Sequence, residues 1–320
     1  MSFSSKAKNE LCHISNEKEC CNLAELAALI QICGTIQLGG RNRVTLRVST
    51  ENPGIARRIY VLLKDQYGVQ TEVMVRKNRR LRKNNNYFLI VSNDKKVMEI
   101  LKETGIIETQ RQGNIWINRT IDPGIVKNRC CRRAYIRGAF LGGGSVSNPQ
   151  KAYHLEFVTH NEIYANSLCN LINQFGLKAK MIERKSNFVV YLKEGEHIVS
   201  LLNIIGAHSA LLDLENIRIY KEMRNNINRI VNCETANLGK TINASVRQIE
   251  NIQYLQDHYG LDKLTPSLKE MAELRLSNPN SSLKELGQML DIPIGKSGVN
   301  HRLRKIDRIA QDLRNKRGRI

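Results

Sequence analysis

An internal repeat constrains the fold of this chain more than any other feature of its sequence. A pair of adjacent cysteines at 20–21 precedes an apolar segment that ends at Gly34, and a second pair at 130–131 precedes a similar segment that ends at Gly144. The second cysteine and the glycine both recur at an interval of 110 residues, from 21 to 131 and from 34 to 144. Self-similarity at a fixed interval indicates that one structural unit is used twice. The first two thirds of the chain are therefore predicted to be a duplication.

Each copy presents the same order of predicted elements. The apolar helix is followed by a pair of strands, a second helix, another pair of strands and a closing helix. The second helix has apolar residues at three- and four-residue steps and stops at Gly68 or Gly176, where glycine can adopt the left-handed conformation that closes a helix. The segments are 44–48, 55–63, 71–76, 87–91 and 97–104 in the first copy, and 153–158, 163–172, 179–183, 188–192 and 198–204 in the second. This order predicts an α+β fold with a duplicated αββαββα core.

The charge of the chain indicates a polyanionic partner. Of the 320 residues, 50 are basic and 30 acidic, which gives a net charge of +20 and an isoelectric point near 9.8. DNA, RNA and anionic lipid surfaces would all be attracted. A membrane role is disfavoured, because the apolar stretch 26–32 is far shorter than the ~18 residues of a spanning helix. Aromatic anchors are few, and the start of the chain lacks a signal-peptide pattern. We expect a cytoplasmic protein without membrane contact.

The cysteines show no spacing that is typical of a metal site. No two of them form Cys-x-x-Cys, and no histidine follows at the spacing of a zinc finger. We therefore predict no metal and no cofactor, and we interpret the thiols as free, small, buried side chains. The adjacent pairs stand at matching repeat positions, which leaves a redox role open as the alternative. The eight cysteines are Cys12, Cys20, Cys21, Cys33, Cys130, Cys131, Cys169 and Cys233.

The two apolar segments resemble the LAGLIDADG motif of homing endonucleases. They are Leu26-Ala-Ala-Leu-Ile-Gln-Ile-Cys-Gly-Thr35 and Ile136-Arg-Gly-Ala-Phe-Leu-Gly-Gly-Gly-Ser145, and the resemblance covers about residues 15–210. It implies that the two motif helices pack side by side through small residues and that two saddle-shaped sheets lie along DNA. Small side chains let helix backbones approach closely, and both segments supply them. These residues are Ala27, Ala28, Gly138 and Ala139.

The same resemblance implies where a nuclease would hold its metal ions. In that family an acidic residue stands just before each motif glycine, and here those positions are Cys33 and Gly143. Two residues earlier stand Gln31 and Leu141, so neither copy supplies a carboxylate. A thiol is a poor ligand for Mg²⁺, and glycine offers no ligand atom. We therefore predict no catalytic residues and no enzyme activity; the alternative is an endonuclease whose catalytic acids are displaced.

A basic segment lies between two predicted strands of the first copy. Arginine and asparagine at a hairpin tip suit contact with phosphates and base edges, so we predict a second DNA contact here, with a solvated surface loop as the alternative. The matching place in the second copy has only Arg184 and Lys185, so the two halves are expected to contribute unequally. The predicted contacts are Arg76, Lys77, Arg79, Arg80, Arg82 and Lys83.

The last third of the chain is predicted to be helical and to end in a helix-turn-helix. A polar break at 232–239 is a candidate hinge within a helical linker. Thr265 and Pro266 then open one helix, and Ser282 with Glu285 forms a capping box that opens the next. The predicted small core comprises Leu286, Leu290, Ile292, Val299 and Leu303.

The remaining face of the last helix is polar and basic, as major-groove recognition requires. A helical domain that docks a protein is the alternative. The predicted DNA-binding residues, within about 281–314, are Ser282, Lys284, Lys296, Ser297, Asn300, His301, Arg302, Arg304 and Lys305.

A LAGLIDADG-like core without acids, followed by a helix-turn-helix, makes the whole chain similar to the WhiA family. The segments 130–145 and Asn232-Cys-Glu-Thr-Ala-Asn237 match that family as well. The resemblance implies a bacterial, nucleoid-associated protein that binds double-stranded DNA and possesses no catalytic activity. It also implies a role in regulating transcription, sporulation, cell division or chromosome segregation, with other DNA-bound regulators as candidate partners. RNA binding is the further alternative, which the lack of aromatic side chains in the basic segment disfavours. The predicted division is 1–14 as an N-terminal helix, 15–125 and 126–212 as repeats, 213–262 as a linker and 263–320 as the helix-turn-helix domain.

Overall fold

A computed structural model describes residues 2–16, 18–39, 43–77, 85–109 and 115–317. The chain divides into two compact units, Met1–Lys221 and Glu222–Ile320. Four of the predicted contacts, Arg79, Arg80, Arg82 and Lys83, lie outside the described residues. Across the described ranges, no helix is both long and apolar enough to span a bilayer.

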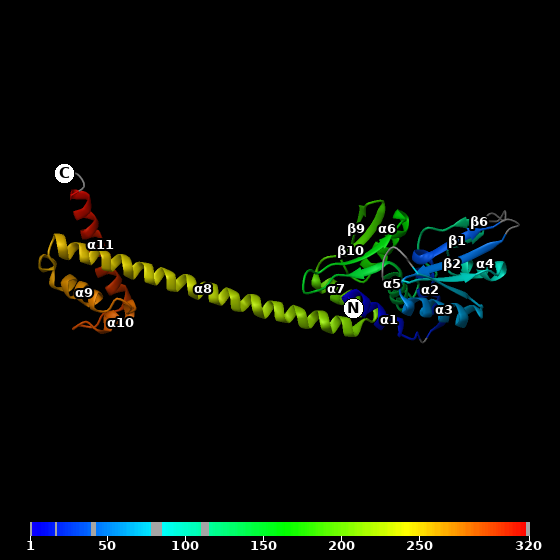
Figure 1. The fold of residues 1–320 in the computed structure, drawn as a ribbon, viewed down its shortest axis with the longest axis horizontal. Coiled ribbons are helices and arrows are strands. Elements are labelled where there is room, and N and C mark those ends of the chain that lie inside the picture. Colours follow the sequence, from blue (N-terminus) through cyan, green and yellow to red (C-terminus); the bar gives the residue numbers. More distant parts are fainter. Residues whose placement is uncertain (1, 17, 40–42, 78–84, 110–114, 318–320) are drawn as a thin grey trace. The chain divides into compact units, whose positions relative to one another are not determined.

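The first unit contains the predicted duplication (Figure 1). After α1 (Phe3–Cys12), each repeat shows the order αββαββα, which confirms the predicted α+β fold. The first repeat comprises α2 (Glu19–Cys33), β1 (Gly34–Leu38), β2 (Val44–Thr50), α3 (Pro53–Tyr67), β3 (Glu72–Lys77), β4 (Asn85–Val91) and α4 (Asp94–Glu103). The second comprises α5 (Arg129–Gly143), β7 (Gly144–Val146), β8 (Leu155–Thr159), α6 (Glu162–Asn173), β9 (Lys180–Arg184), β10 (Asn187–Leu192) and α7 (Gly195–Ile205).

The two repeats form equivalent antiparallel sheets. Their strand orders are β1-β2-β4-β3 and β7-β8-β10-β9, so each sheet has the same topology. Each motif glycine begins the first strand of its sheet, with Gly34 opposite Val48 and Gly144 opposite Phe157. Helices α3 and α4 pack on the first sheet, and α6 packs on the second. A short hairpin of β5 (Ile107–Thr109) and β6 (Ile115–Ile117), which the sequence pattern did not predict, lies between the repeats in the chain.

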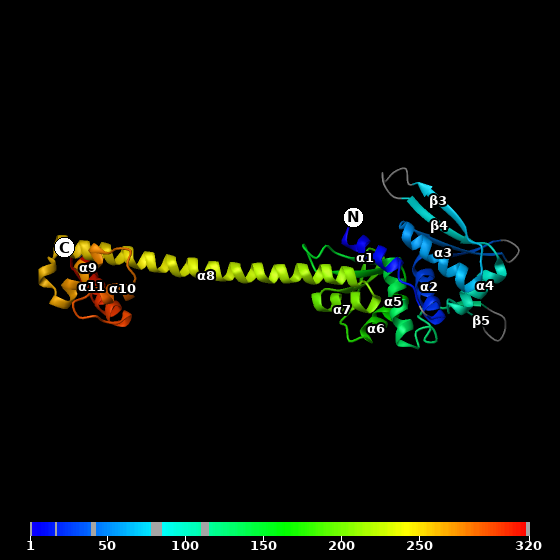
Figure 2. The ribbon, with the colours of Figure 1, turned by 90° about the horizontal axis from the view of Figure 1, so that it is seen from below.

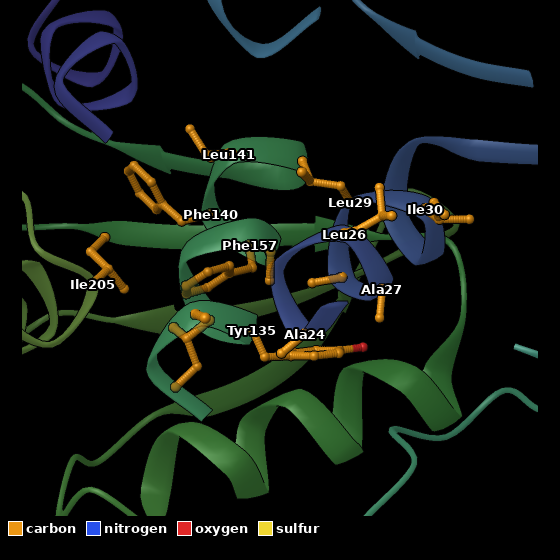
Figure 3. Packing of buried hydrophobic residues seen from close by; sticks show 14 of the residues in the cluster. Ala24, Leu26, Ala27, Leu29, Ile30, Tyr135, Phe140, Leu141, Phe157 and Ile205 are labelled. Atoms are coloured by element: carbon orange, nitrogen blue, oxygen red, sulfur yellow. The ribbon is translucent and has the colours of Figure 1, made fainter. Parts of the chain in front are cut away.

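The core of the first unit is built around α2 and α5, which lie side by side (Figure 3). Residues 24–30 of helix α2 are buried and apolar except for Glu25, as expected for a helix enclosed by other elements. A Cβ atom at Gly138 would stand 2.4 Å from the carbonyl oxygen of Glu25 and 3.0 Å from the Cβ of Ala28. Glycine therefore permits the close approach of the two helices, as the small residues of the motifs predicted.

Helix α8 (His208–His258) corrects one expectation about the last third of the chain. The polar segment 232–239 was predicted to break the helix and act as a hinge, but it is helical throughout. It contains no proline, and a single interior glycine costs a helix only about 1 kcal/mol, which neighbouring turns can offset. The hydroxyl of Thr241 donates to the carbonyl oxygen of Asn237 at 3.0 Å, so this side chain bonds within the helix.

The second unit has its own hydrophobic core. After the end of α8 come a short 3-10 turn (Leu261–Lys263), α9 (Pro266–Ser277), α10 (Leu283–Gln288) and α11 (Lys296–Arg317), as Figure 2 shows. Ile252 and Leu255 of α8 are fully buried in this core, so the compact unit includes part of α8 and extends well before residue 263. Four of the five predicted core residues are buried, but Ile292 is 77% exposed, which corrects its assignment. Ile294 packs against the core, and its amide donates to Gly287.

Candidate nucleic-acid interface

The start of α10 is held by a complete capping box. The hydroxyl of Ser282 accepts from the amide of Glu285 at 3.3 Å, and the Glu285 carboxylate accepts from the amide of Ser282 at 2.7 Å. These bonds lower the pKa of the Glu285 carboxyl, first through the backbone amide of Ser282. The predicted box is confirmed.

A buried arginine supports the same region from α9. Arg275 is 3% exposed, and it donates to Gln248 of α8 at 3.1 Å and to the carbonyl oxygen of Ser281 at 2.8 Å. Burial lowers the pKa of its guanidinium. Arg275 therefore ties α8, α9 and the segment before α10 together. The sequence pattern did not indicate this role, because an arginine is rarely fully buried unless it is paired.

A hollow of about 430 Å³ lies among α8, α10 and α11 within the second unit. It brings together five of the predicted DNA-binding residues, and it adds the basic side chains of Lys240 and Arg247 from α8, which the sequence analysis missed. The acidic group among its lining residues, Asp307, accepts from Asn251 at 2.8 Å and lies 3.7 Å from the Arg247 guanidinium. The lining residues are Lys240, Thr241, Ala244, Arg247, Gln248, Arg275, Ser282, Leu283, Lys284, Lys296, Asn300, Arg304 and Asp307.

The other predicted residues of α11 take two different positions. Ser297, His301 and Lys305 are exposed and lie outside the lining of the hollow. Arg302 turns toward α9 instead, with its guanidinium 3.6 Å from the Glu270 carboxylate and 3.4 Å from the carbonyl oxygen of Ser267. Arg302 therefore contributes to packing within the unit.

The first unit was predicted to offer a second basic contact next to its sheet. Of that set, Arg76 and Lys77 are described, and both are exposed at the end of β3. The whole of β3 is exposed, so this edge of the sheet presents a strand to solvent. In the second repeat, Arg184 and Lys185 stand at the matching β9–β10 turn, where Lys185 and Ser186 have φ values of 49° and 62°.

The ends of the two motif helices contain no carboxylate at the positions before the glycines. The sulfur of Cys33 stands 3.1 Å from where a Cβ atom at Gly142 would lie, so position 142 lies against the end of α2. A Cβ atom at Gly143 would lie 2.6 Å from the carbonyl oxygen of Val158. Any side chain at 143 would therefore require the backbone to move.

A lysine from α1 reaches this helix end. The ammonium of Lys8 donates to the carbonyl oxygen of Leu141 at 3.0 Å, and burial lowers the pKa of Lys8 while the nearby Cys33 opposes that shift. Burial also raises the pKa of the Cys33 thiol to about 11. The thiol is thus protonated at neutral pH, and a lysine side chain stands at this helix end in place of a carboxylate. This arrangement suits neither metal binding nor activation of water.

The adjacent cysteine pairs come together, although 110 residues separate them in the chain. Cys21 and Cys131 are buried, as the interpretation of small buried side chains requires, whereas Cys20 is exposed and Cys130 is half-buried. All four sulfur atoms lie within 4.8 Å of one another. The absence of Cys-x-x-Cys spacing therefore does not decide whether these residues can act as one site.

Comparison with known families covers most of the chain. The model of the WhiA N-terminal LAGLIDADG-like domain matches residues 19–107. The model of the WhiA LAGLIDADG-like domain matches residues 132–224, and that of the WhiA C-terminal HTH domain matches residues 227–310. The predicted order of a duplicated core and a helix-turn-helix is thus confirmed.

Relatives match along their whole length. The chain is 57% identical over 316 residues to a "Probable cell division protein WhiA" of Alkaliphilus metalliredigens, with 99% of each chain covered. It is 55% identical over 319 residues to a protein of the same name in Clostridium acetobutylicum, with 100% of each covered. Among solved structures, full-length DUF199/WhiA from Thermatoga maritima is 25% identical, with a TM-score of 0.60, and the match covers 98% of this chain and 99% of that one.

Proposed function

Because the chain belongs to the WhiA family, we propose that it binds double-stranded DNA mainly through its helix-turn-helix and does not cut it. The observation that carries this proposal is the basic hollow of the second unit. There, Lys240, Arg247, Lys284, Lys296 and Arg304 surround two polar groups, the hydroxyl of Ser282 and the amide of Asn300. A net charge of +20 would attract the DNA from a distance.

The proposed contacts follow from where each side chain stands on its helix. Lys284 near the start of α10 and Lys240 of α8 would neutralise phosphates, as basic residues flanking a recognition helix do. Asn300 and Arg304 lie one and two turns after Lys296 on α11 and can bond to adenine and guanine edges. Ser297, His301 and Lys305 add exposed polar groups on the same helix. In this proposal Arg302 packs against α9 within the second unit and does not contact DNA.

A second contact is proposed for the first unit. Arg76 and Lys77 at the end of β3 would bind phosphates together with Arg79, Arg80, Arg82 and Lys83, which follow them in the chain. Two contacts on one chain raise the effective concentration of each for the same duplex. The second repeat has fewer basic residues at its matching turn, so the first repeat would contribute more.

The absence of catalysis is the second part of the proposal. Phosphodiester cleavage in the LAGLIDADG fold requires acids at the motif helix ends, and Cys33, Gly143 and the Lys8 ammonium stand there instead. The WhiA relatives are named probable cell division proteins. We therefore infer a role at the nucleoid as a regulator of transcription, cell division or chromosome segregation, alongside other DNA-bound regulators.

We expect the full chain to bind supercoiled plasmid and leave it intact. The protein is incubated with plasmid in Mg²⁺ or Mn²⁺, part of each sample is examined as the complex, and the rest is freed of protein before electrophoresis. The expected result is a retarded complex whose DNA remains supercoiled. Nicked or linear plasmid that increases with time would instead support an endonuclease with displaced acids.

A competition experiment on the same complex tests whether the protein prefers DNA or RNA. Single-stranded RNA of matched length is added as a competitor in the presence of labelled duplex DNA. The proposal expects unlabelled duplex to displace the label at a lower concentration than RNA does. A preference for RNA would overturn the assignment of the helix-turn-helix to a DNA groove.

A further inference from the structure

Four thiols converge where the first turns of α2 and α5 meet. The sulfur atoms of Cys20, Cys21, Cys130 and Cys131 all lie within 4.8 Å of one another, and those of Cys130 and Cys131 are 4.0 Å apart. In each helix the pair directly follows the first helical residue. The duplication therefore assembles one compact set of four soft donor atoms from two distant segments.

The cluster lies in the first turns of two helices, next to their positive ends. Backbone N–H groups in the first turn of a helix lack intrahelical acceptors and form the positive end of the helix dipole. In the described helices α2 and α5, neither N-cap residue, Lys18 or Asn128, makes a side-chain capping bond. Two helix starts thus direct their positive ends toward the same four sulfurs.

The spacing of the sulfurs fits a single tetrahedral ion. Zinc–sulfur bonds of about 2.3 Å place the four sulfurs of a tetrahedron about 3.8 Å apart, so the cluster would contract by about 1 Å at most. Clusters of several irons need a wider arrangement, because sulfides and more than one metal lie between the cysteines. A disulfide within either pair would join neighbouring residues of a regular helix, whose backbone does not bring adjacent sulfurs to bonding distance.

We propose that Cys20, Cys21, Cys130 and Cys131 together bind one zinc ion as a tetrahedral tetrathiolate. Binding releases the thiol protons and leaves a centre with a net charge of −2, which the two helix starts and Lys18 offset. The exposed Cys20 gives the ion a path of entry. The ion would join the two repeats at the start of the helix pair, about 20 Å along the helices from Cys33.

Cobalt substitution tests this proposal on the full chain. The protein is kept reduced, freed of metal with a chelator and titrated with Co²⁺, which gives intense visible bands and sulfur-to-metal charge transfer in a tetrahedral thiolate site. We expect these bands to saturate at one equivalent of Co²⁺ and to disappear on addition of one equivalent of Zn²⁺. Zinc should also raise the melting temperature of the reduced protein.

The double variant Cys20→Ser/Cys130→Ser removes one ligand from each helix. These are the two less buried cysteines of the cluster, so serine should be tolerated, and Cys20→Ser alone serves as a milder variant. Cobalt binding by the double variant should weaken by more than the about 100-fold that is typical of losing an outer-shell partner. The matched control is Cys233→Ser, which changes an exposed thiol of α8 outside the cluster and should leave binding unchanged.

Three outcomes would overturn the zinc site. The reduced wild-type protein could fail to bind Co²⁺ or Zn²⁺ in a one-to-one ratio, or the cobalt spectrum could be that of an octahedral oxygen site. The double variant could bind cobalt as tightly as Cys233→Ser does. If the reduced protein binds no metal and mass spectrometry of the oxidised protein finds disulfides between the two pairs, the cluster is a redox site instead.

Discussion

Replacing both Lys296 and Arg304 by alanine should weaken duplex DNA binding of the full chain by about 100-fold or more. Both side chains line the hollow of the second unit, one in the first turn of α11 and the other two turns later. Contacts of this kind contribute about 1–3 kcal/mol each, and losing one phosphate contact lowers the steepness of the salt dependence by about 1. Fluorescence anisotropy with labelled duplex, repeated across a range of salt concentrations, measures both quantities.

Arg302→Ala is the matched control on the same helix. The sequence pattern placed Arg302 among the DNA contacts, but its guanidinium lies 3.6 Å from Glu270 and is directed toward α9. DNA affinity should therefore change by less than about threefold, since a surface ion pair contributes no more than about 1 kcal/mol to stability. Equal losses from Arg302→Ala and from the double variant would mean that the face of α11 turned toward α9 contacts DNA.

Replacing Glu25 by alanine should lower the free energy of unfolding of the first unit by about 3–5 kcal/mol. Glu25 is fully buried in α2, and its carboxylate accepts from the guanidinium of Arg58 at 2.8 Å and from that of Arg137 at 3.0 Å. The amide of Asn16 donates to it at 2.9 Å. The alanine variant would leave two buried or nearly buried guanidinium groups without their shared counter-ion. Urea unfolding followed by circular dichroism measures the loss.

Glu99→Ala is the control variant for the loss of stability expected from Glu25→Ala. The Glu99 carboxylate lies 2.8 Å from the ammonium of Lys96, but both side chains are about two-fifths exposed, at 43% and 39%. Solvent screening limits such a pair to about 1 kcal/mol or less. If the two variants are destabilised equally, the buried ion cluster does not hold α2, α3 and α5 together as the geometry indicates.

The duplicated fold could be predicted because it depends on patterns within each segment. Apolar residues at helical and strand spacing identified the helices and six strands of the two repeats, whereas β1 and β7 were expected only as members of a strand pair, without residue bounds. Gly68, with φ of 61°, ends α3 as expected. The small residues of the two motifs indicated close helix packing, which Gly138 against Glu25 demonstrates. The capping box at Ser282 was also visible, because its two residues stand at a fixed local spacing.

Several features could not be predicted from local sequence patterns, because they depend on how distant parts of the chain pack together. The segment 232–239 contains polar residues that are typical of turns, yet it has no proline, and helix continues through it. Ile292 fitted an apolar core pattern, but the connector exposes it and uses Ile294 instead. The four-cysteine cluster arises because two helices 110 residues apart lie in parallel register. Glu25 did leave a signal, because it is the acid within the apolar run of residues 23–30 in α2.

The central claim is that this chain recognises DNA through the basic face of its second unit. Mapping the chromosomal sites bound in cells tests it most directly, with the wild-type chain and the Lys296→Ala/Arg304→Ala variant expressed at equal levels. We expect the wild type to be enriched at sites that share a common duplex sequence and the variant to lose this enrichment. Enrichment of the variant at the same sites, or no enrichment of the wild type at any site, would contradict it.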